Sequence, residues 1–242
     1  MGDHVSTRAA IEVQSGMLDN LMWHSLVGPH AHLAEGSGPV RRYDPDVALF
    51  AAVEHAGPEA WDALQTLVGA KRTAFLTGSM VGSVPTGWVR LFQGLGHQMI
   101  LRRPEQLAPM DPSVTIEALT ADDVPQMLAL VELAQPGPFR PRTIEMGAYF
   151  GVFNGDRQLI ALAGERLRAA GYTEISAVAT HPDARRRGLG GLLTSHVARH
   201  IASRGDTPLL HVTATNETAK RVYDRLGFET RKQLEWVAVE TP

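Results

Sequence analysis

The chain has 242 residues, of which 44% are hydrophobic and 20% are charged, and its formal net charge is -3. This composition is typical of a folded protein, with room for one large domain or two small ones. The chain has no cysteine, which excludes a disulfide framework, a thiolate metal site and a cysteine acyl-enzyme. The slightly negative charge also argues against nucleic acid or an anionic membrane as a partner.

The N-terminal sequence shows no targeting pattern. It lacks a basic start followed by an apolar core, and no uninterrupted stretch of about 18 apolar residues occurs in the chain. We therefore expect no membrane span and a cytoplasmic location.

The first part of the chain predicts a mixture of helices and strands. Residues 7–27 carry a loosely helical apolar stripe, which predicts one helix or a helix broken at residues 15–16. Apolar runs at 47–53 and 72–77 predict two strands. The helix expected between them starts near Pro58, which suits a first turn, and ends at Gly69.

A hairpin is expected next. Residues 88–93 and 98–101 predict strands, and the Gly94-Leu95-Gly96 sequence between them is a turn signal. Residues 102–113 hold three prolines and several charges, which is typical of a connector. We therefore place a domain boundary between residues 112 and 113, with an N-terminal α/β supporting domain at 1–112 and a second domain at 113–242.

Two histidine pairs are candidates for a metal site. His30 and His32 lie in a segment bounded by glycine and proline, and His196 and His200 lie one helical turn apart. A third ligand is missing at a matching spacing, and Val197 stands where zinc enzymes with a His-Glu-x-x-His motif carry their glutamate. We expect two loop histidines, two partly buried and hydrogen-bonded histidines, and no metal.

The second part predicts an alternation of strands and helices. A strand at 114–119 precedes a helix whose start, Thr120-Ala-Asp-Asp123, resembles a capping box. A short helix at 143–148 and a hairpin follow, the hairpin turning through Asn154-Gly155 in a type I' turn. The hairpin strands are expected at 149–153 and 158–167, and the later elements at 172–180 (strand), 188–203 (helix), 209–214 (strand), 217–226 (helix) and 233–240 (strand).

The segment from Glu174 to Gly191 predicts a strand, a loop and a helix start. Alternation places Ile175, Ala177 and Ala179 on one face of the strand, and Glu174, Ser176, Val178 and Thr180 on the other. Apolar residues at helical spacing begin at Leu189, so the basic and glycine-rich run lies at the first helical turn. Glycines at 188, 190 and 191 would let an anion approach the unpaired N–H groups of that turn.

Two motifs in this region resemble a known family. The order Arg185-x-x-Gly188-x-Gly190 resembles the acyl-CoA loop of GNAT-type (Gcn5-related) N-acetyltransferases. Asn216-x-x-Ala219-x-x-x-Tyr223, followed by Leu226-Gly227-Phe228, resembles the family's second signature. The resemblance covers about residues 113–242 and implies a GNAT fold with a mixed α/β sheet there. The order of elements in the N-terminal half also permits a degenerate copy of that fold, as in the glycine N-acyltransferase-like branch.

The resemblance implies acetyl-CoA as co-substrate. Its pyrophosphate would bind at the loop, and its pantetheine arm would pair with the edge of strand 172–180, in a gap left by strand 209–214. The implied binding residues are Val178, Ala179, Thr180, Arg185, Arg186, Arg187, Gly188, Leu189, Gly190, Gly191, Asn216, Ala219 and Tyr223.

Two residues are candidates for proton transfer. A primary amine has a pKa of about 10 and must lose a proton before it attacks a thioester. Glu174, fourteen residues before Gly188, matches the base glutamate of the histone-acetylating branch, although a structural salt bridge would explain it equally well. Tyr223 matches the family's usual acid and would protonate the departing thiolate; it also fits the buried side of its helix, and both roles can hold together.

The sequence thus predicts an N-acyltransferase, most simply an acetyltransferase, in which a primary amine attacks acetyl-CoA directly. A non-catalytic acyl-CoA sensor or scaffold is the alternative. Nucleic-acid binding through Arg185–Arg187 is opposed by the net charge. The loops at 135–148 and 229–235, where the resemblance places a small amine acceptor, carry charges of both signs and select no acceptor class; a homodimer is left open.

Overall fold

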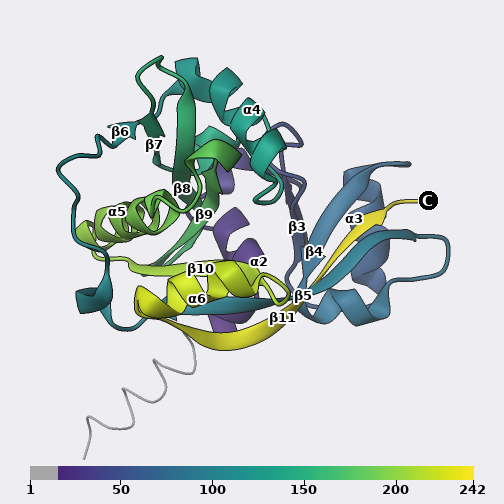
Figure 1. Ribbon diagram of the computed structural model, residues 1–242. Helices are drawn as coiled ribbons and strands as arrows, with labels where there is room; N and C mark the ends of the chain where they lie inside the picture. Colours follow the sequence, from purple (N-terminus) through teal and green to yellow (C-terminus); the bar gives the residue numbers. More distant parts are fainter. Residues whose placement is uncertain (1–15) are drawn as a thin grey trace, which may run out of the picture.

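The computed structural model describes residues 16–242, so the first part of the helix expected at 7–27 lies outside the described residues. Its main feature is a mixed sheet of eight strands in the order β4-β11-β5-β10-β9-β8-β7-β6 (Figure 1). The strands are β4 (Thr73–Thr77), β5 (Val89–Leu101), β6 (Glu117–Ala118), β7 (Tyr149–Phe153), β8 (Leu159–Ala169), β9 (Tyr172–Thr180), β10 (Thr207–Thr213) and β11 (Phe228–Glu240). The predicted mixed α/β fold is confirmed.

Helices cover both faces of this sheet. The helices are α2 (Leu21–Leu26), α3 (Pro58–Val68), α4 (Val124–Ala134), α5 (Leu189–Ser203) and α6 (Glu217–Arg225). Helices α5 and α6 share one buried cluster with β5, β8 and β10, while α4 packs on the opposite face of β8 and β9. Helix α2 joins that opposite face further along, against Ile100, Leu167 and Leu209. Because neighbouring residues such as Met99 and Ile100 belong to different clusters, the sheet is the middle layer of the protein.

The N-terminal part adds a smaller sheet of three strands, β1 (Ala34–Glu35), β2 (Val40–Tyr43) and β3 (Ala51–Val53). Helix α3 and strand β4 lie within one residue of their predicted bounds, whereas the strand expected at 47–53 begins only at Ala51. Strands β1 and β2 were missed because they are too short to show a periodic pattern.

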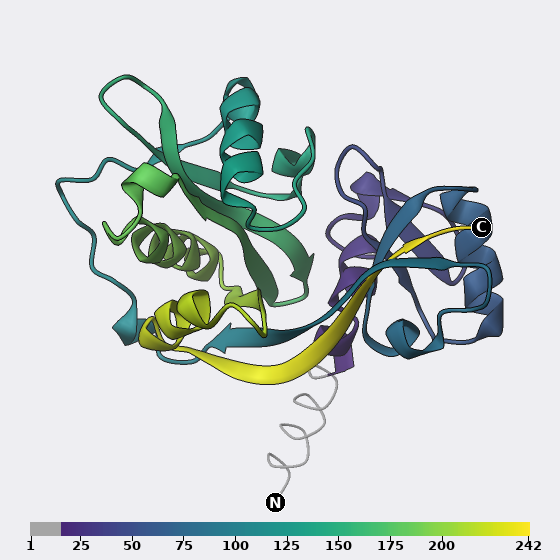
Figure 2. The same ribbon diagram turned by 45° about the vertical axis from the view of Figure 1, so that its right-hand side comes forward.

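The two long strands β5 and β11 connect the two parts of the molecule (Figure 2). Strand β5 comes before the predicted boundary in the sequence, yet it pairs with β10 on one side and with β11 on the other. The far end of β11 pairs with β4 of the N-terminal part. The large sheet is therefore continuous across residues 102–113, which form only one short 3-10 turn, Pro104–Gln106.

The hairpin predicted at residues 88–101 is wrong. Those residues form one strand, and Gly94, Leu95 and Gly96 pair in register with Trp236, Glu235 and Leu234 of β11. A Cβ on Gly96 would lie 1.7 Å from the indole of Trp236. Glycine at position 96 thus permits a close approach of a large ring. A glycine within a strand can indicate such a contact as well as a turn.

Replacing Gly96 with alanine is expected to lower the free energy of unfolding by about 1–3 kcal/mol, because the new methyl group forces Trp236 to move. Gly155→Ala is the control, since a Cβ there meets nothing within 4 Å, and we expect a change within about 0.5 kcal/mol. Urea unfolding of both variants measures the difference. Equal stabilities would contradict the packing role of Gly96.

Three local predictions have different outcomes. The capping box is present: the Asp123 carboxylate accepts from the Thr120 N–H at 2.8 Å. The type I' turn is wrong, because the Asn154 Oδ1 accepts from the N–H groups of Asp156 (3.0 Å) and Gln158 (2.9 Å). The positive φ falls on Arg157. The asparagine side chain thus builds a longer loop than its Asn-Gly sequence indicates.

The short helix expected at 143–148 is a 3-10 turn at Thr143–Met146.

Candidate active site

The basic loop and the start of α5 form an exposed anion-binding geometry. Gly188 is the N-cap with φ 78°, and the first backbone bond of the helix runs from the Leu192 N–H to the Gly188 carbonyl at 3.0 Å. The amides of residues 189–191 therefore have no acceptor within the helix. Residues 185–188 are all exposed, so both the arginine side chains and this helix start are accessible.

The loop lies against the other predicted binding residues. A Cβ on Gly190 would be 3.7 Å from Val178 Cγ1 and 3.8 Å from Thr180 Oγ1, at the end of β9. A Cβ on Gly191 would be 3.7 Å from Val222 Cγ1 of α6. The structure thus brings the two sequence motifs together with the end of β9.

Strands β9 and β10 separate at the predicted place. They pair in parallel from Tyr172↔Thr207 to Ile175↔Leu210 and no further. Beyond that point β10 continues to pair with β5, and β9 continues to pair with β8 up to Thr180. The facing edges of the two strands are consequently open, and the predicted gap is confirmed.

The predicted faces of β9 are wrong beyond residue 176. Ile175 and Val178 pack in the cluster that contains α5, while Ala177 and Ala179 pack with α4. Ala177 has φ 52°, and the register of β8 against β9 shifts beside it. This bulge breaks the strict alternation on which the prediction depended.

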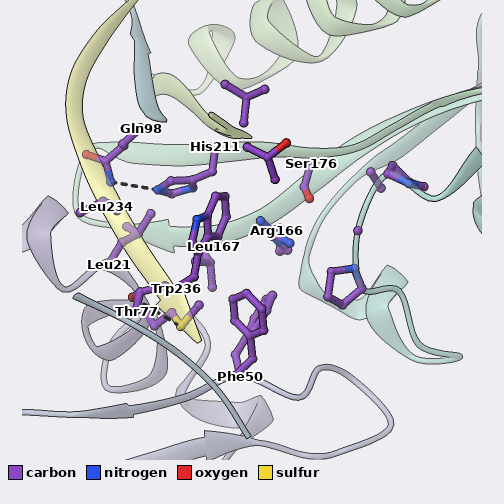
Figure 3. Close-up of a pocket in the computed structure, with 18 of the residues that line it drawn as sticks. Leu21, Phe50, Thr77, Gln98, Arg166, Leu167, Ser176, His211, Leu234 and Trp236 are labelled. Atoms are coloured by element: carbon purple, nitrogen blue, oxygen red, sulfur yellow. Dashed lines mark hydrogen bonds between the residues drawn. The ribbon is translucent and has the colours of Figure 1, made fainter. Parts of the chain in front are cut away.

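A pocket of about 480 Å³ extends from this gap into the molecule, between the two parts of the chain (Figure 3). At the gap it is lined by residues of β9, β10 and α6, and further in by Arg166 and His211. The inner residues are mostly apolar and come from both parts of the chain: Leu18, Leu21, Met22, Leu49, Phe50, Phe75, Phe92, Leu167, Leu234 and Trp236.

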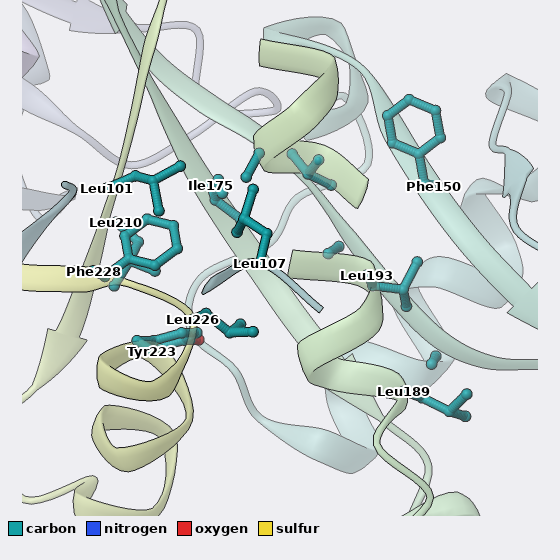
Figure 4. Close-up of a cluster of buried hydrophobic side chains, with 14 of the residues drawn as sticks. Leu101, Leu107, Phe150, Ile175, Leu189, Leu193, Leu210, Tyr223, Leu226 and Phe228 are labelled. Atoms are coloured by element: carbon teal, nitrogen blue, oxygen red, sulfur yellow. The ribbon is translucent and has the colours of Figure 1, made fainter. Parts of the chain in front are cut away.

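Tyr223 lines the pocket from α6 and is 8% exposed. Its ring packs beside Phe228, with centroids 6.1 Å apart, in the cluster drawn in Figure 4. Burial raises the pKa of Tyr223 to about 12, so the hydroxyl keeps its proton at neutral pH. The described residues provide no hydrogen-bond partner for this hydroxyl.

Asn216 also lines the pocket, and it has a structural task as well. Its Oδ1 accepts from the Ala219 N–H at 3.0 Å and caps the start of α6. The cap fixes the first turn of the helix that carries Tyr223.

Glu174 is fully buried and does not line the pocket. Its carboxylate accepts from Arg166 Nη2 (2.6 Å) and Nε (2.9 Å), from the Leu167 N–H (3.2 Å) and from His211 Nδ1 (2.7 Å). Burial alone would raise the pKa of Glu174, but the charge of Arg166 and the hydrogen bonds hold it well below its usual range. A carboxylate held by four donors is a weak proton acceptor. This geometry therefore disfavours the prediction that Glu174 removes the proton of the amine directly.

Four neighbouring groups determine the tautomer of His211. Arg231 can only donate, so the atom of Gln98 that it contacts at 2.8 Å is the amide oxygen. The Gln98 nitrogen donates to the Leu18 carbonyl (3.0 Å) and lies 3.1 Å from His211 Nε2. Nε2 must therefore accept, and Nδ1 carries the proton donated to Glu174.

The sequence alone did not identify Arg166, Gln98 or His211. The available signal was a polar residue within an apolar strand, such as His211 in Leu209–Val212. Such a residue indicates a buried hydrogen-bond partner but does not say which one.

The histidines of the two candidate metal sites have other partners. His30 is buried and lies 2.9 Å from the Tyr43 hydroxyl, and burial lowers the pKa of His30 to about 4. His30 lies in a turn, as predicted for a loop histidine, but its side chain belongs to the core. His196 and His200 are half-buried as predicted, but they pack against the Phe150 ring, with centroids 4.5 and 5.1 Å away. Within residues 16–242, no group of three or more potential ligands is placed to hold a metal ion. None of the described helices has the length and apolarity needed to span a bilayer.

Comparison with known proteins gives consistent results for this region. Residues 149–237 match the family model described as FR47-like protein. A crystal structure from Novosphingobium aromaticivorans, assigned to the GNAT family of acetyltransferases, is 36% identical with a TM-score of 0.84, covering 93% of this chain and 98% of that one. A GCN5-related N-acetyltransferase from Kribbella flavida shares the fold at 22% identity, with a TM-score of 0.59 over 96% and 95% of the two chains.

Two curated relatives differ in how much of them is matched. The ribosomal protein bS18-alanine N-acetyltransferase of Salmonella typhimurium is 32% identical over 124 residues, which are 47% of this chain and 80% of the relative. The mycothiol acetyltransferase of Rhodococcus jostii is 49% identical over 57 residues, 23% of this chain. The match spans only 19% of that relative's length.

Proposed function

Because this chain belongs to the GNAT family of acetyltransferases, we propose that it transfers an acetyl group from acetyl-CoA to a primary amine, which attacks the thioester directly. The observation that carries this proposal is the gap between β9 and β10, which opens into a pocket lined by Tyr223. A sensor would need the binding loop but not a tyrosine hydroxyl that lines the pocket and has no partner among the described residues.

The residues around the gap fit the chemistry of acetyl-CoA. The amides of residues 189–191 and the exposed side chains of Arg185–Arg187 would hold the pyrophosphate. The open edge of β9, from Val178 to Thr180, would accept and donate hydrogen bonds to the pantetheine amides as a further strand would. Asn216 retains its side-chain nitrogen as a donor toward the same arm.

We assign proton transfer to two places in the pocket. Tyr223 would donate its phenolic proton to the sulfur that leaves, since the hydroxyl is protonated and has no partner within residues 16–242. On the other side, His211 lines the pocket with an unprotonated Nε2. Glu174 would serve as base indirectly: it holds the Nδ1 proton of His211, so that Nε2 could receive the proton of the amine once the amine displaces the Gln98 amide, which occupies that lone pair in the structure.

Three finer assignments stay predictions. They are the glycine N-acyltransferase-like branch, a homodimer, and the division of the chain at residues 112 and 113. The continuous sheet and the pocket-lining residues of the N-terminal part favour its role as a support for the site.

Replacing Gly188 with valine is expected to weaken acetyl-CoA binding by tenfold or more, because a branched side chain would stand over the free amides of α5. Gly205→Val is the matched control at the other end of the same helix. Both glycines have positive φ, 78° and 85°, and open space at the Cβ, so valine meets the same kind of backbone strain at either position. Isothermal titration with acetyl-CoA measures the affinity, and an unchanged value for Gly188→Val would remove the loop from the proposal.

A further inference from the structure

We infer that the acceptor is a small amine carrying one aromatic or similarly apolar group, and that polycationic amines are excluded. This inference rests on the proposed acetyl transfer and names the substrate class of the same pocket. It follows from the arrangement of rings and charges at the inner end of the pocket, which is the end away from the gap between β9 and β10.

An arc of aromatic rings lines that inner end. The ring centroids of Phe50 and Phe75 are 5.5 Å apart, and those of Phe75 and Trp236 are 6.3 Å apart. Trp236 in turn lies 6.1 Å from the ring of His211. All four side chains line the pocket. Phe75, Trp236 and His211 come from β4, β11 and β10, and Phe50 comes from an isolated bridge beside β4; Figure 3 labels Phe50, Trp236 and His211. A ligand group within this arc would be surrounded by ring faces and edges, which favour another ring.

A charged pair behind the pocket wall connects the two ends of the arc, Phe50 and His211. The Arg166 guanidinium lies 5.0 Å from the centroid of Phe50 and is bound to Glu174, which also binds His211. The arginine charge is thus already compensated by a buried carboxylate. The polar part of the enclosure therefore lies beside His211 and the strand gap, and the apolar part lies away from it.

The charges of the pocket exclude a second ammonium group. Asp19 is the only acidic residue among the described side chains that line it. Its carboxylate is paired with Arg231 and, at 2.6 Å, with Lys232. A polyamine or an aminoglycoside would bring several positive charges into this apolar space without an available carboxylate, and desolvation of each charge would oppose binding.

The N-terminal part of the chain restricts the size of the acceptor. Leu21 and Met22 of α2 and Leu49, Phe50 and Phe75 form walls of the same pocket. These walls stand at the inner end, and the acetyl-bearing arm must enter through the strand gap. A volume of about 480 Å³ shared with that arm suits a molecule with one ring better than a protein segment.

The amine itself has a suitable partner at the gap. Ser176 follows Ile175, the last residue of β9 that pairs with β10, and it lines the pocket. Figure 3 shows its hydroxyl within the group of lining side chains. The described residues provide no partner for this hydroxyl. An amine held between Ser176 and His211 would lie at the junction of the acyl arm and the aromatic arc.

Binding without turnover tests the acceptor class first. Titrations of the full chain, saturated with CoA, would use 2-phenylethylamine, n-butylamine and spermidine as ligands. We expect 2-phenylethylamine to bind at least about tenfold more tightly than either of the others, as one well-placed ring contact predicts. Equal affinities, or tighter binding of spermidine, would overturn the inference whether or not any amine is acetylated.

A variant pair connects the preference to the arc. Phe50→Leu keeps an apolar side chain and is expected to weaken 2-phenylethylamine binding about tenfold, with n-butylamine changed by less than about twofold. Phe153→Leu is the control, because Phe153 is a half-buried phenylalanine outside the pocket. Loss of 2-phenylethylamine affinity in both variants, or in neither, would contradict the arc as the binding site.

Acetylation of the same amines, followed by thiol release and mass spectrometry, separates this inference from the proposed function. Acetylation of 2-phenylethylamine supports both. Acetylation of spermidine, an aminoglycoside or a peptide N-terminus with no reaction of 2-phenylethylamine leaves the proposed function in place and overturns the acceptor class. Tight binding of 2-phenylethylamine without acetylation of any amine overturns the proposed function and supports the binding class.

Discussion

Replacing Tyr223 with phenylalanine is expected to lower kcat for acetyl transfer by about a hundredfold or more, with little change in acetyl-CoA affinity. The physical reason is that general acid catalysis commonly contributes a factor of this size, and the substitution removes only the hydroxyl. The ring remains in its cluster with Leu226 and Phe228, so folding is preserved. Steady-state kinetics at saturating acetyl-CoA, with a parallel binding titration, measures both quantities.

Tyr149→Phe is the matched control. The Tyr149 hydroxyl is also buried, has no hydrogen-bond partner, and does not line the pocket. Its removal should leave kcat unchanged and stability equal or slightly higher, because an unsatisfied buried hydroxyl is lost. If Tyr223→Phe kept the parental kcat, the assignment of Tyr223 as the acid would be wrong.

Glu174→Gln is expected to lower the free energy of unfolding by about 3–5 kcal/mol at pH 7. The substitution leaves the Arg166 charge buried without a carboxylate, which is the costly way to break a buried ion pair. Glu117→Gln is the control, since its partner Arg157 is 66% exposed, and exposed pairs contribute about 0–1 kcal/mol. Urea unfolding at neutral pH compares the two variants. Equal losses of unfolding free energy would show that the buried Glu174 pair contributes no more to stability than an exposed ion pair does.

The pH dependence of this difference has a definite sign. The pKa of Glu174 is lower in the folded protein than its ordinary value, so ionisation stabilises the fold above the unfolded-state pKa of about 4.3. The stability difference between wild type and Glu174→Gln should therefore be constant above about pH 5 and shrink as the pH falls below about 4. A difference that grew in acid would mean that Glu174 is protonated in the folded state.

The same variant separates positioning from structure. If Glu174 acts through His211, the loss of rate in Glu174→Gln should shrink at high pH, where more of the amine is neutral without help. A loss of rate that stays constant across the pH range would indicate a structural effect only. Rates are measured under conditions in which the variant is still fully folded. The loss of catalytic rate is then distinct from the loss of stability.

Features that depend on neighbouring residues were determined by the sequence itself. The helix start at Gly188–Leu189, the cap of α6 and the capping box at Thr120 each need only a few adjacent residues, and each lies at the predicted place or within one residue of it. The end of the pairing between β9 and β10, implied by the family resemblance, is also present. Local backbone geometry depends on local side chains, so such motifs can be recognised without a structure.

Only the tertiary structure decided the features that require contacts between distant segments. Gly94-Leu95-Gly96 looks like a turn until Trp236, about 140 residues later, packs against Gly96. The partners of Glu174 come from two other strands, and no spacing in the sequence shows that Arg166 and His211 surround it. The aromatic arc is likewise assembled from the N-terminal part and β11. Pairing across a sheet depends on register and on the bulge at Ala177, and these are consequences of the packing of the whole chain.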